Sequence, residues 1–251
     1  MKQVGVFVAT RWEFNAVREA VAVDKQERTG AFHGVVGRRG GVRVRLIQTG
    51  VGIDQAGAAS REALAAYPFE LVISAGFACA LSSARVGDLL IGTDVILHGG
   101  ARSSPLSSSS FVCSSDYRDM ALQAAREVAP TSRSGRFVTV SRVLWRAEHK
   151  REVAAATGGV ASDMESAAIA ESAHLRRVPF MIARAASDLV DEDLPLDFNL
   201  FLRPAGWLRG FAMVMAHPSS LAGLHRLRTQ SAEAAARLTV FYGKFFDALR
   251  E

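Results

Sequence analysis

Three carboxylate side chains lie at the ends of predicted strands or at the start of a predicted helix. Glu13 follows the apolar run Val4–Ala9. Asp188 ends the apolar run that starts at Phe180, and Glu165 precedes an Ala-rich stretch. The carboxyl ends of strands are where open α/β sheets bind their ligands. Two carboxylates in different surroundings can divide acid and base work, one donating a proton while the other activates water.

Each of these carboxylates also has a purely structural interpretation. Glu13, in a first helical turn, would complement the helix dipole. Ser162 and Glu165 have the spacing of a capping box, which would tie Glu165 to the start of its helix. The alternative for Glu165 is a binding role, because one carboxylate can accept hydrogen bonds from both hydroxyls of a ribose. Asp188 would either cap the following segment or place an acid in a pocket.

A glycine interrupts the apolar run that begins at Leu71. The stretch continues through Gly76 and Phe77 to Cys79 and Ala80. A glycine near the end of a strand lets a ligand approach the backbone closely. We therefore count Gly76 and Phe77 among the candidate binding residues.

The elements that must position these residues follow from the hydrophobic pattern. Strands are expected at Val4–Ala9, Val42–Ile47, Leu71–Ser74, Asp88–Ile91, Val95–Leu97, Phe137–Val140 and Phe180–Ala185. Helices are expected at Glu13–Ala22, Asp54–Ala66, Asp116–Ala129, Ala147–Ala156 and Met164–His174. Short buried strands that alternate with helices predict an α/β protein whose sheet is covered on both faces.

Composition and charge exclude several classes of protein. The 251 residues are 49% hydrophobic and 22% charged, which is typical of a globular chain. The net charge is +5, but the basic residues are scattered and lack interleaved aromatics, so no nucleic-acid partner is expected. The two cysteines, Cys79 and Cys113, give neither a disulfide framework nor a zinc ligand set, and we expect no metal and no cofactor. No signal-peptide pattern and no run of about 18 apolar residues is present, so a cytoplasmic location is expected.

Two segments stand apart from the α/β pattern. Ser103–Ser115 is rich in serine and is predicted to be a loop, either a lid over a site or a surface connection. Pro204–Glu251 has a helical pattern in which Trp207, Leu208, Phe211 and Met215 share one apolar face. That face either packs on the body or a neighbouring subunit, or it contacts a lipid-like substituent or a membrane surface, with Arg203 and Arg209 toward lipid phosphates.

Two stretches carry a family resemblance. They are Asp163-Met-Glu-Ser-Ala-Ala-Ile169 and, some twenty residues later, Val178-Pro-Phe180 with Arg184-Ala and Ser187-Asp188. In this order and spacing the chain resembles the nucleoside phosphorylase/nucleosidase superfamily from about Val4 to Leu202. It is most similar to the methylthioadenosine/S-adenosylhomocysteine nucleosidase branch. The resemblance implies a three-layer α/β/α domain with a central mixed sheet over residues 1–202, a C-terminal helical extension over 203–251 packed on the same domain, and a homo-oligomer.

The resemblance also implies roles for individual residues. Glu13 matches the carboxylate that activates water, and Asp188, oriented by Ser187, matches the acid that protonates purine N7. The implied substrate-binding residues are Gly76, Phe77, Trp145, Met164, Glu165 and Ser187, with Met164 and Glu165 on the ribose and Trp145 stacked on the base. The implied function is a purine nucleosidase that releases the base from an adenosine-type nucleoside with a 5′-substituent.

Two departures from the family pattern bear on the nucleophile. Phe77 stands where the superfamily usually has a small hydroxyl residue that can contact phosphate. Ala9-Thr-Arg-Trp-Glu13 replaces the Gly-Asp-x-x-Arg phosphate loop of the phosphorylases. Both departures favour hydrolysis over phosphorolysis, and a phosphorylase remains the alternative.

Two further alternatives concern the substrate and the activity itself. The apolar C-terminal segment is expected to have no counterpart in the small nucleosidases. It resembles the hopanoid-associated branch, which suggests a lipid-linked nucleoside as substrate. An inactive nucleoside-binding protein is the alternative of another class, although a binding module needs no acid and base pair.

Overall fold

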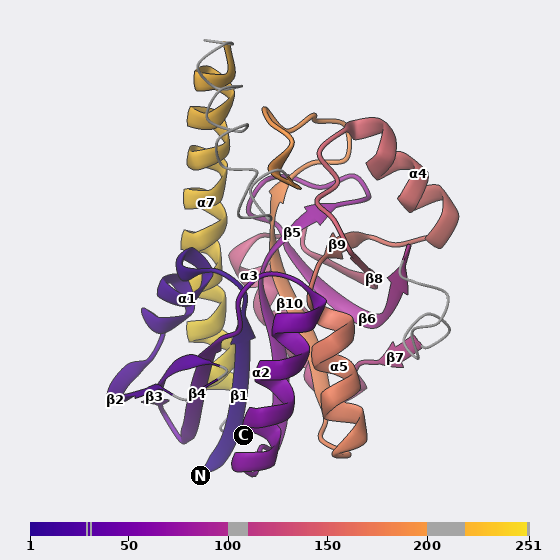
Figure 1. Ribbon diagram of the computed structural model, residues 1–251. Helices are drawn as coiled ribbons and strands as arrows, with labels where there is room; N and C mark the ends of the chain where they lie inside the picture. The colour runs from indigo at the N-terminus through magenta and orange to yellow at the C-terminus, as the bar shows by residue number, and fades with distance from the viewer. Residues whose placement is uncertain (29, 31, 100–109, 200–218, 250–251) are drawn as a thin grey trace.

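The computed structural model describes residues 1–28, 30, 32–99, 110–199 and 219–249 (Figure 1). Its strands are β1 (Lys2–Val8), β2 (Ala22–Arg28), β3 (His33–Arg39), β4 (Val42–Gln48), β5 (Leu71–Ala80), β6 (Leu89–His98), β7 (Ser110–Val112), β8 (Arg133–Val140), β9 (Ala161–Asp163) and β10 (Phe180–Asp188). Its helices are α1 (Arg11–Arg18), α2 (Ile53–Ala66), α3 (Ser115–Val128), α4 (Ala147–Thr157), α5 (Ser166–Leu175) and α7 (Ser219–Ala248).

The strands form one mixed sheet that closes on itself at one end. Its order is β10-β6-β8-β9-β5-β1-β4-β3-β2, with β7 paired to β6. Strand β10 also pairs with β5, so β5, β10, β6, β8 and β9 form a ring of hydrogen-bonded strands. The closure gives Cys79 on β5 two partners, Asp188 on one side and Ser162 on the other. Segments far apart in the sequence therefore meet at the end of β5.

Helices cover both faces of the sheet, as Figure 1 shows. One apolar core joins α1, α3 and α7 to one face, through side chains such as Phe14, Ala121 and Phe241. A second core joins α2 and α5 to the other face, through side chains such as Ala59 and Ile169. The predicted three-layer α/β/α architecture with a central mixed sheet is confirmed.

The differences from the predicted elements have physical causes. β2 and β3 were not predicted; every residue of β2 is exposed or half-buried, so an edge strand of this kind shows no hydrophobic alternation. The two strands predicted at Asp88–Ile91 and Val95–Leu97 are one continuous strand, β6. The first helix ends at Arg18, before the predicted Ala22, and Ala22 begins β2.

The Ser-rich stretch is only partly a loop. Its residues 103–109 lie outside the described residues, whereas Ser110–Val112 forms β7 and pairs antiparallel with β6. Ser115 is the first residue of α3. The prediction of a loop across the whole stretch is therefore wrong at its C-terminal end.

The C-terminal helix α7 is part of the core. The predicted apolar face at Trp207, Leu208, Phe211 and Met215 lies outside the described residues. Within α7, six side chains at helical spacing are buried, including Leu238, Phe241, Tyr242 and Phe245. The Tyr242 hydroxyl donates a hydrogen bond to the Ala183 carbonyl of β10 at 2.9 Å. None of the described helices is long and apolar enough to cross a membrane.

The two faces of α7 are expected to differ sharply in their contribution to stability. Leu238 is fully buried and Val240, two residues away, is half exposed. Leu238→Ala should lower the free energy of unfolding by about 2–5 kcal/mol, because it leaves a cavity in the core. Val240→Ala should change it by less than about 0.5 kcal/mol. Urea unfolding of both variants measures the difference, and equal small effects would show that α7 does not pack as described.

Candidate active site

A cavity lies where the C-terminal ends of β1, β5, β8, β9 and β10 meet. It holds about 600 Å³ of empty space, part of it open to solvent. The polar side chains that line it are Thr10, Glu13, Cys79, Ser162, Asp163, Glu165, Arg184, Ser187 and Asp188. Its apolar lining consists of Ala9, Val51, Phe77, Ala78, Val140, Val143, Leu144, Met164 and Leu194. The expected meeting of ligand-binding residues at the strand ends is thus present in the fold.

Glu13 is held in this cavity by three hydrogen bonds. Its Oε2 accepts from the Thr10 backbone N–H at 2.7 Å and from the Thr10 hydroxyl at 2.8 Å. Its Oε1 accepts from the Phe77 backbone N–H at 2.7 Å. Thr10 and Glu13 form a capping box at the start of α1, so Glu13 both caps the helix and faces the cavity.

The absence of a side chain at Gly76 leaves space for the Glu13 carboxylate. The Gly76 φ of +135° is a backbone conformation that residues with a side chain rarely adopt. A Cβ atom at this position would overlap the Glu13 carboxylate. Gly76 does not itself line the cavity. Its place in the site is to let β5 approach α1 closely.

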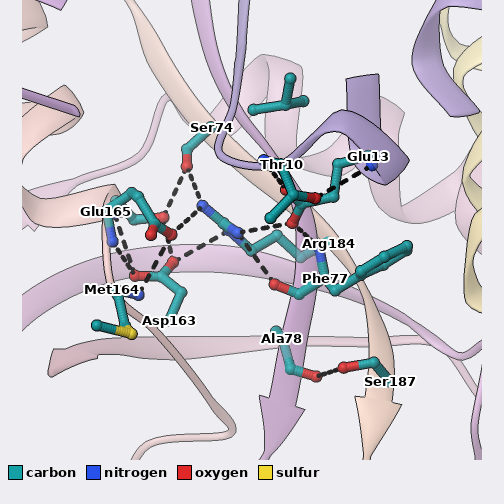
Figure 2. Close-up of polar contacts among 12 residues, drawn as sticks. Thr10, Glu13, Ser74, Phe77, Ala78, Asp163, Met164, Glu165, Arg184 and Ser187 are labelled. Carbon is teal, nitrogen blue, oxygen red and sulfur yellow. Dashed lines mark hydrogen bonds and ion pairs between the residues drawn. The ribbon is translucent and has the colours of Figure 1, made fainter. Parts of the chain in front are cut away.

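Arg184 lies at the centre of a buried charge cluster (Figure 2). Its Nη1 donates to the Phe77 carbonyl at 3.0 Å and lies 3.8 Å from Glu13 Oε1. Its Nη2 donates to the Ser74 hydroxyl at 2.9 Å and lies 3.5 Å from Glu165 Oε2.

Arg184 also lies against the carboxylate of Asp163. The Arg184 Nε lies 3.1 Å from Asp163 Oδ2, an ion pair without hydrogen-bond geometry. One guanidinium therefore balances three carboxylates in the protein interior, those of Glu13, Asp163 and Glu165. Such a cluster leaves excess negative charge beside the cavity.

Asp163 and Glu165 are fixed at the start of α5. Asp163 Oδ1 accepts from the backbone N–H groups of Glu165 and Ser166 and from the Thr139 hydroxyl. The N-cap residue of α5 is Glu165, and the Asp163 carboxylate, not the Ser162 hydroxyl, accepts from the backbone at the start of the helix, so the capping-box interpretation of Ser162 and Glu165 is wrong. Glu165 Oε1 instead accepts from the Gly52 N–H at 2.9 Å, across the cavity wall.

The environment of Glu165 raises its pKa from 4.5 to about 7. Burial is the main cause, because it penalises the charged carboxylate. Arg184 opposes the shift, while the nearby carboxylates of Asp163 and Glu13 increase it. Glu165 thus changes charge near neutral pH.

Asp188 lies at the other end of the cavity, with a partner on each oxygen. Its Oδ1 accepts from the Ser187 hydroxyl at 3.1 Å. Its Oδ2 accepts from the Lys150 ammonium at 2.7 Å. Lys150 comes from α4 and is fully buried. Asp188 is therefore held in a set orientation by its neighbour on β10 and by a cation behind it.

The structure brings most of the predicted site residues together. Glu13, Phe77, Met164, Glu165, Ser187 and Asp188 all line the cavity. Trp145 does not line it: its ring faces the Arg146 guanidinium at 4.5 Å, and Val143 and Leu144 line the wall instead.

Sequence reasoning missed three charged residues of the site, Arg184, Asp163 and Lys150. Arg184 carried a signal, since an arginine inside an apolar strand needs buried partners. Asp163 stood unnoticed inside a quoted motif. Nothing in the sequence indicated that Lys150 is buried, because its helix has exposed charges at neighbouring positions.

Known proteins resemble this chain in sequence. The family model described as the phosphorylase superfamily matches residues 3–205. The chain belongs to the phosphorylase superfamily. Among curated relatives, a 5′-methylthioadenosine/S-adenosylhomocysteine nucleosidase of Staphylococcus saprophyticus is 29% identical over 179 residues, covering 67% of this chain and 78% of that protein.

Solved structures share the fold of this phosphorylase-superfamily chain. The 5′-methylthioadenosine/S-adenosylhomocysteine nucleosidase of Neisseria meningitidis, in complex with methylthio-immucillin-A, superposes with a TM-score of 0.75 at 24% identity, covering 97% of this chain and 99% of that one. The futalosine hydrolase of Helicobacter pylori superposes with a TM-score of 0.77 at 17% identity, covering 98% and 97%. These alignments leave almost no part of the chain unmatched. The expectation that the C-terminal segment has no counterpart in such nucleosidases is therefore wrong.

The buried cluster predicts a contrast between two arginines of this superfamily member. Arg184→Met should lower the free energy of unfolding by about 3–5 kcal/mol at pH 7, because it leaves buried carboxylates without their cation. Arg38, whose ion pair with Asp24 is on the surface, serves as the matched control. Arg38→Met should cost no more than about 1 kcal/mol. Urea unfolding measures both values, and similar losses would contradict the central role of Arg184.

Proposed function

We propose that this chain is a purine nucleosidase that hydrolyses the N-glycosidic bond of an adenosine-type nucleoside with a 5′-substituent. The observation that carries the proposal is the cavity with Glu13 and Arg184 at one end and Asp188 at the other. A base and an acid are thus available at opposite ends of a space that a nucleoside can enter. The nucleosidase names of the relatives support the same reaction.

In this mechanism Glu13 activates the nucleophile. Its carboxylate, fixed by Thr10 and the Phe77 N–H, orients a water molecule and takes a proton from it as the water oxygen bonds to C1′ of the ribose. The bond between C1′ and purine N9 breaks, and its electron pair stays with the purine. Asp188 donates a proton to N7, so the base leaves as a neutral purine.

The ribose is proposed to lie against Met164 and Glu165. The ionised Glu165 carboxylate accepts hydrogen bonds from the two ring hydroxyls, and the Met164 side chain packs on the sugar. The base then lies toward Ser187 and Asp188, between apolar side chains that include Phe77 and Leu144. Trp145, predicted to stack on the base, has no place in this arrangement.

The charge of the cavity supports water over phosphate as the nucleophile. The carboxylates of Glu13, Asp163 and Glu165 line it, together with Asp188 as the protonated acid, while Arg184 is the only cation among the described lining residues. Arg184 is already paired with three of these carboxylates. A phosphate dianion would meet net negative charge, whereas water would not.

An assay with and without phosphate tests the proposal. We expect 5′-methylthioadenosine to yield adenine and free methylthioribose at the same rate in both buffers. Formation of a ribose 1-phosphate, dependent on added phosphate, would establish the phosphorylase alternative. Binding without any release of base would favour the inactive nucleoside-binding alternative. A lipid-linked nucleoside in the same panel tests the hopanoid-like alternative.

Two variants test the assigned roles. Glu13→Gln and Asp188→Asn keep the shape of each side chain while removing the base or the acid. Each should lower kcat by about 100-fold or more, with a smaller change in KM. Steady-state kinetics of adenine release measures both values. Full activity of either variant would remove that residue from the mechanism.

The raised pKa of Glu165 predicts how activity depends on pH. We expect kcat/KM to rise as pH increases through about 7, because the ribose hydroxyls need the ionised carboxylate. Glu165→Gln should abolish this rise and lower kcat/KM by about 10- to 100-fold, through loss of charge-assisted hydrogen bonds. A pH profile from 5 to 9 measures the effect.

Stability provides a control for the same group. Because the folded pKa of Glu165 lies above 4.5, ionising Glu165 disfavours the folded state. Stability should therefore fall as pH rises from 4.5 toward 7, and Glu165→Gln should lose that part of the fall. A variant with the wild-type pH profile and the wild-type stability curve would contradict the assignment.

The predicted homo-oligomer and cytoplasmic location remain predictions.

A further inference from the structure

The Lys150 ammonium is the most completely buried charge that the proposed chemistry leaves without a role. Its side chain on α4 is 0% exposed. Its three protons have three acceptors: Asp188 Oδ2 at 2.7 Å, the Glu192 carbonyl at 2.8 Å and the Leu189 carbonyl at 3.0 Å. A lysine is almost never buried in this way unless it is paired. Among the described residues, its only charged partner is the carboxylate proposed to act as the acid.

We propose that Lys150 is a positioning residue that stabilises the negative charge developing on Asp188 as its proton moves to the purine. This inference rests on the proposed function. The proton leaves Asp188 for N7, and the resulting carboxylate lies 2.7 Å from an ammonium that does not have to move. A fixed charge that stabilises the transition state more than the ground state accelerates the reaction.

The geometry assigns different tasks to the two oxygens of Asp188. Oδ2 accepts from the Lys150 ammonium, and Oδ1 accepts from the Ser187 hydroxyl, which is a neutral donor. Oδ1 therefore has capacity left for the purine. Lys150 holds the carboxyl group from behind and does not need to touch the substrate.

Few other charges act on Asp188 from the elements packed around it. The Cys79 thiol of β5 also interacts with Asp188, and burial together with Asp188 raises the pKa of Cys79, so it stays neutral. The Glu192 side chain accepts from Gln230 on α7, and only its backbone carbonyl contacts Lys150. Glu13, Asp163 and Glu165 line the same cavity and add negative charge to it. Lys150 is thus the cation that directly balances Asp188.

Neighbouring contacts between α4 and the segment after β10 provide controls. Asp193 Oδ1 accepts from the Ala147 N–H at the start of α4, at 2.7 Å. Arg151 forms an exposed ion pair with Asp191 at 3.1 Å. Both contacts tie the same segment to the same helix, and neither places a charge on Asp188. Loosening of the segment can therefore be separated from loss of the ammonium.

The kinetic experiment compares Lys150→Met with Asp193→Ala and Arg151→Met, using 5′-methylthioadenosine. Without the ammonium, the buried Asp188 carboxyl should hold its proton to higher pH and donate it less readily. Lys150→Met should therefore lower kcat about tenfold or more, change KM less, and move the alkaline limb of the pH profile to higher pH. Both control variants should keep the wild-type limb. A limb unchanged in Lys150→Met, or shifted equally in Asp193→Ala, would overturn the proposal.

A double variant tests whether Lys150 acts through Asp188. In the Asp188→Asn background, Lys150→Met should cause no further loss of kcat, because the group that it serves is gone. A loss that multiplies with that of Asp188→Asn would assign Lys150 a separate structural role.

Thermal unfolding gives a readout that does not need activity. The loss of melting temperature in Lys150→Met should grow from pH 5 to pH 8, as the unpaired carboxyl ionises in the unfolded chain but resists ionisation in the fold. Asp188→Asn should remove that growth. If Lys150→Met fails to fold at both pH values and Asp188→Asn does not rescue it, the ion pair is not the reason and the proposal fails. If Lys150→Met shows the predicted unfolding pattern but the wild type releases no adenine, the proposed function fails while the ion pair stands.

Discussion

The buried ion cluster around Arg184 constrains this structure more than any other interaction. A guanidinium in the interior needs its charge balanced and its donors largely satisfied. Here three carboxylates balance the charge and Phe77, Ser74 and Glu165 accept from the two Nη atoms, while Nε faces Asp163 without hydrogen-bond geometry. The partners come from α1, β5, β9 and the start of α5. Bringing them to one arginine requires that these elements take their observed places. The cluster is therefore a condition of the fold and of the cavity at the same time.

Closure of the sheet supplies the geometry that the cluster needs. Because β5 pairs with both β10 and β9, residues near its end lie between Asp188 and Ser162. An open sheet would leave these two segments apart. The positive φ of Gly76 then lets β5 approach Glu13. Strand pairing and one glycine together set the distance between the proposed base and the rest of the site.

Electrostatics divides the cavity into two regions. At one end, Glu13, Asp163 and Glu165 share a single cation, and the pKa of Glu165 rises to about 7 as a result of burial and this crowding. At the other end, Asp188 has a cation of its own in Lys150. Carboxylates of the same chemical type thus meet different environments, which is the condition for dividing acid and base work.

The sequence by itself determined the elements and most of the site. Apolar runs ending in polar residues located β1, β5 and β10. Glu13 and Asp188 followed from their places at the ends of two of those runs and from the family resemblance, and Glu165 followed from the resemblance. These signals are local: hydrophobic period and the residue types next to strand ends are visible within a few positions. The edge strand β2 gave no such signal, because no residue of it is buried.

Only the tertiary structure decided how the charges are paired. Lys150 and Asp188 are 38 positions apart, and the helix around Lys150 shows no pattern that marks one charged residue as buried. Trp145 shows the reverse case, since the family resemblance implied a residue that stacks on the base, but its ring lies against Arg146. Sequence states which groups are available, whereas burial and pairing depend on which strands become neighbours. The ring of β5, β10, β6, β8 and β9 sets those neighbours, and through them which charged groups lie next to one another in the cavity.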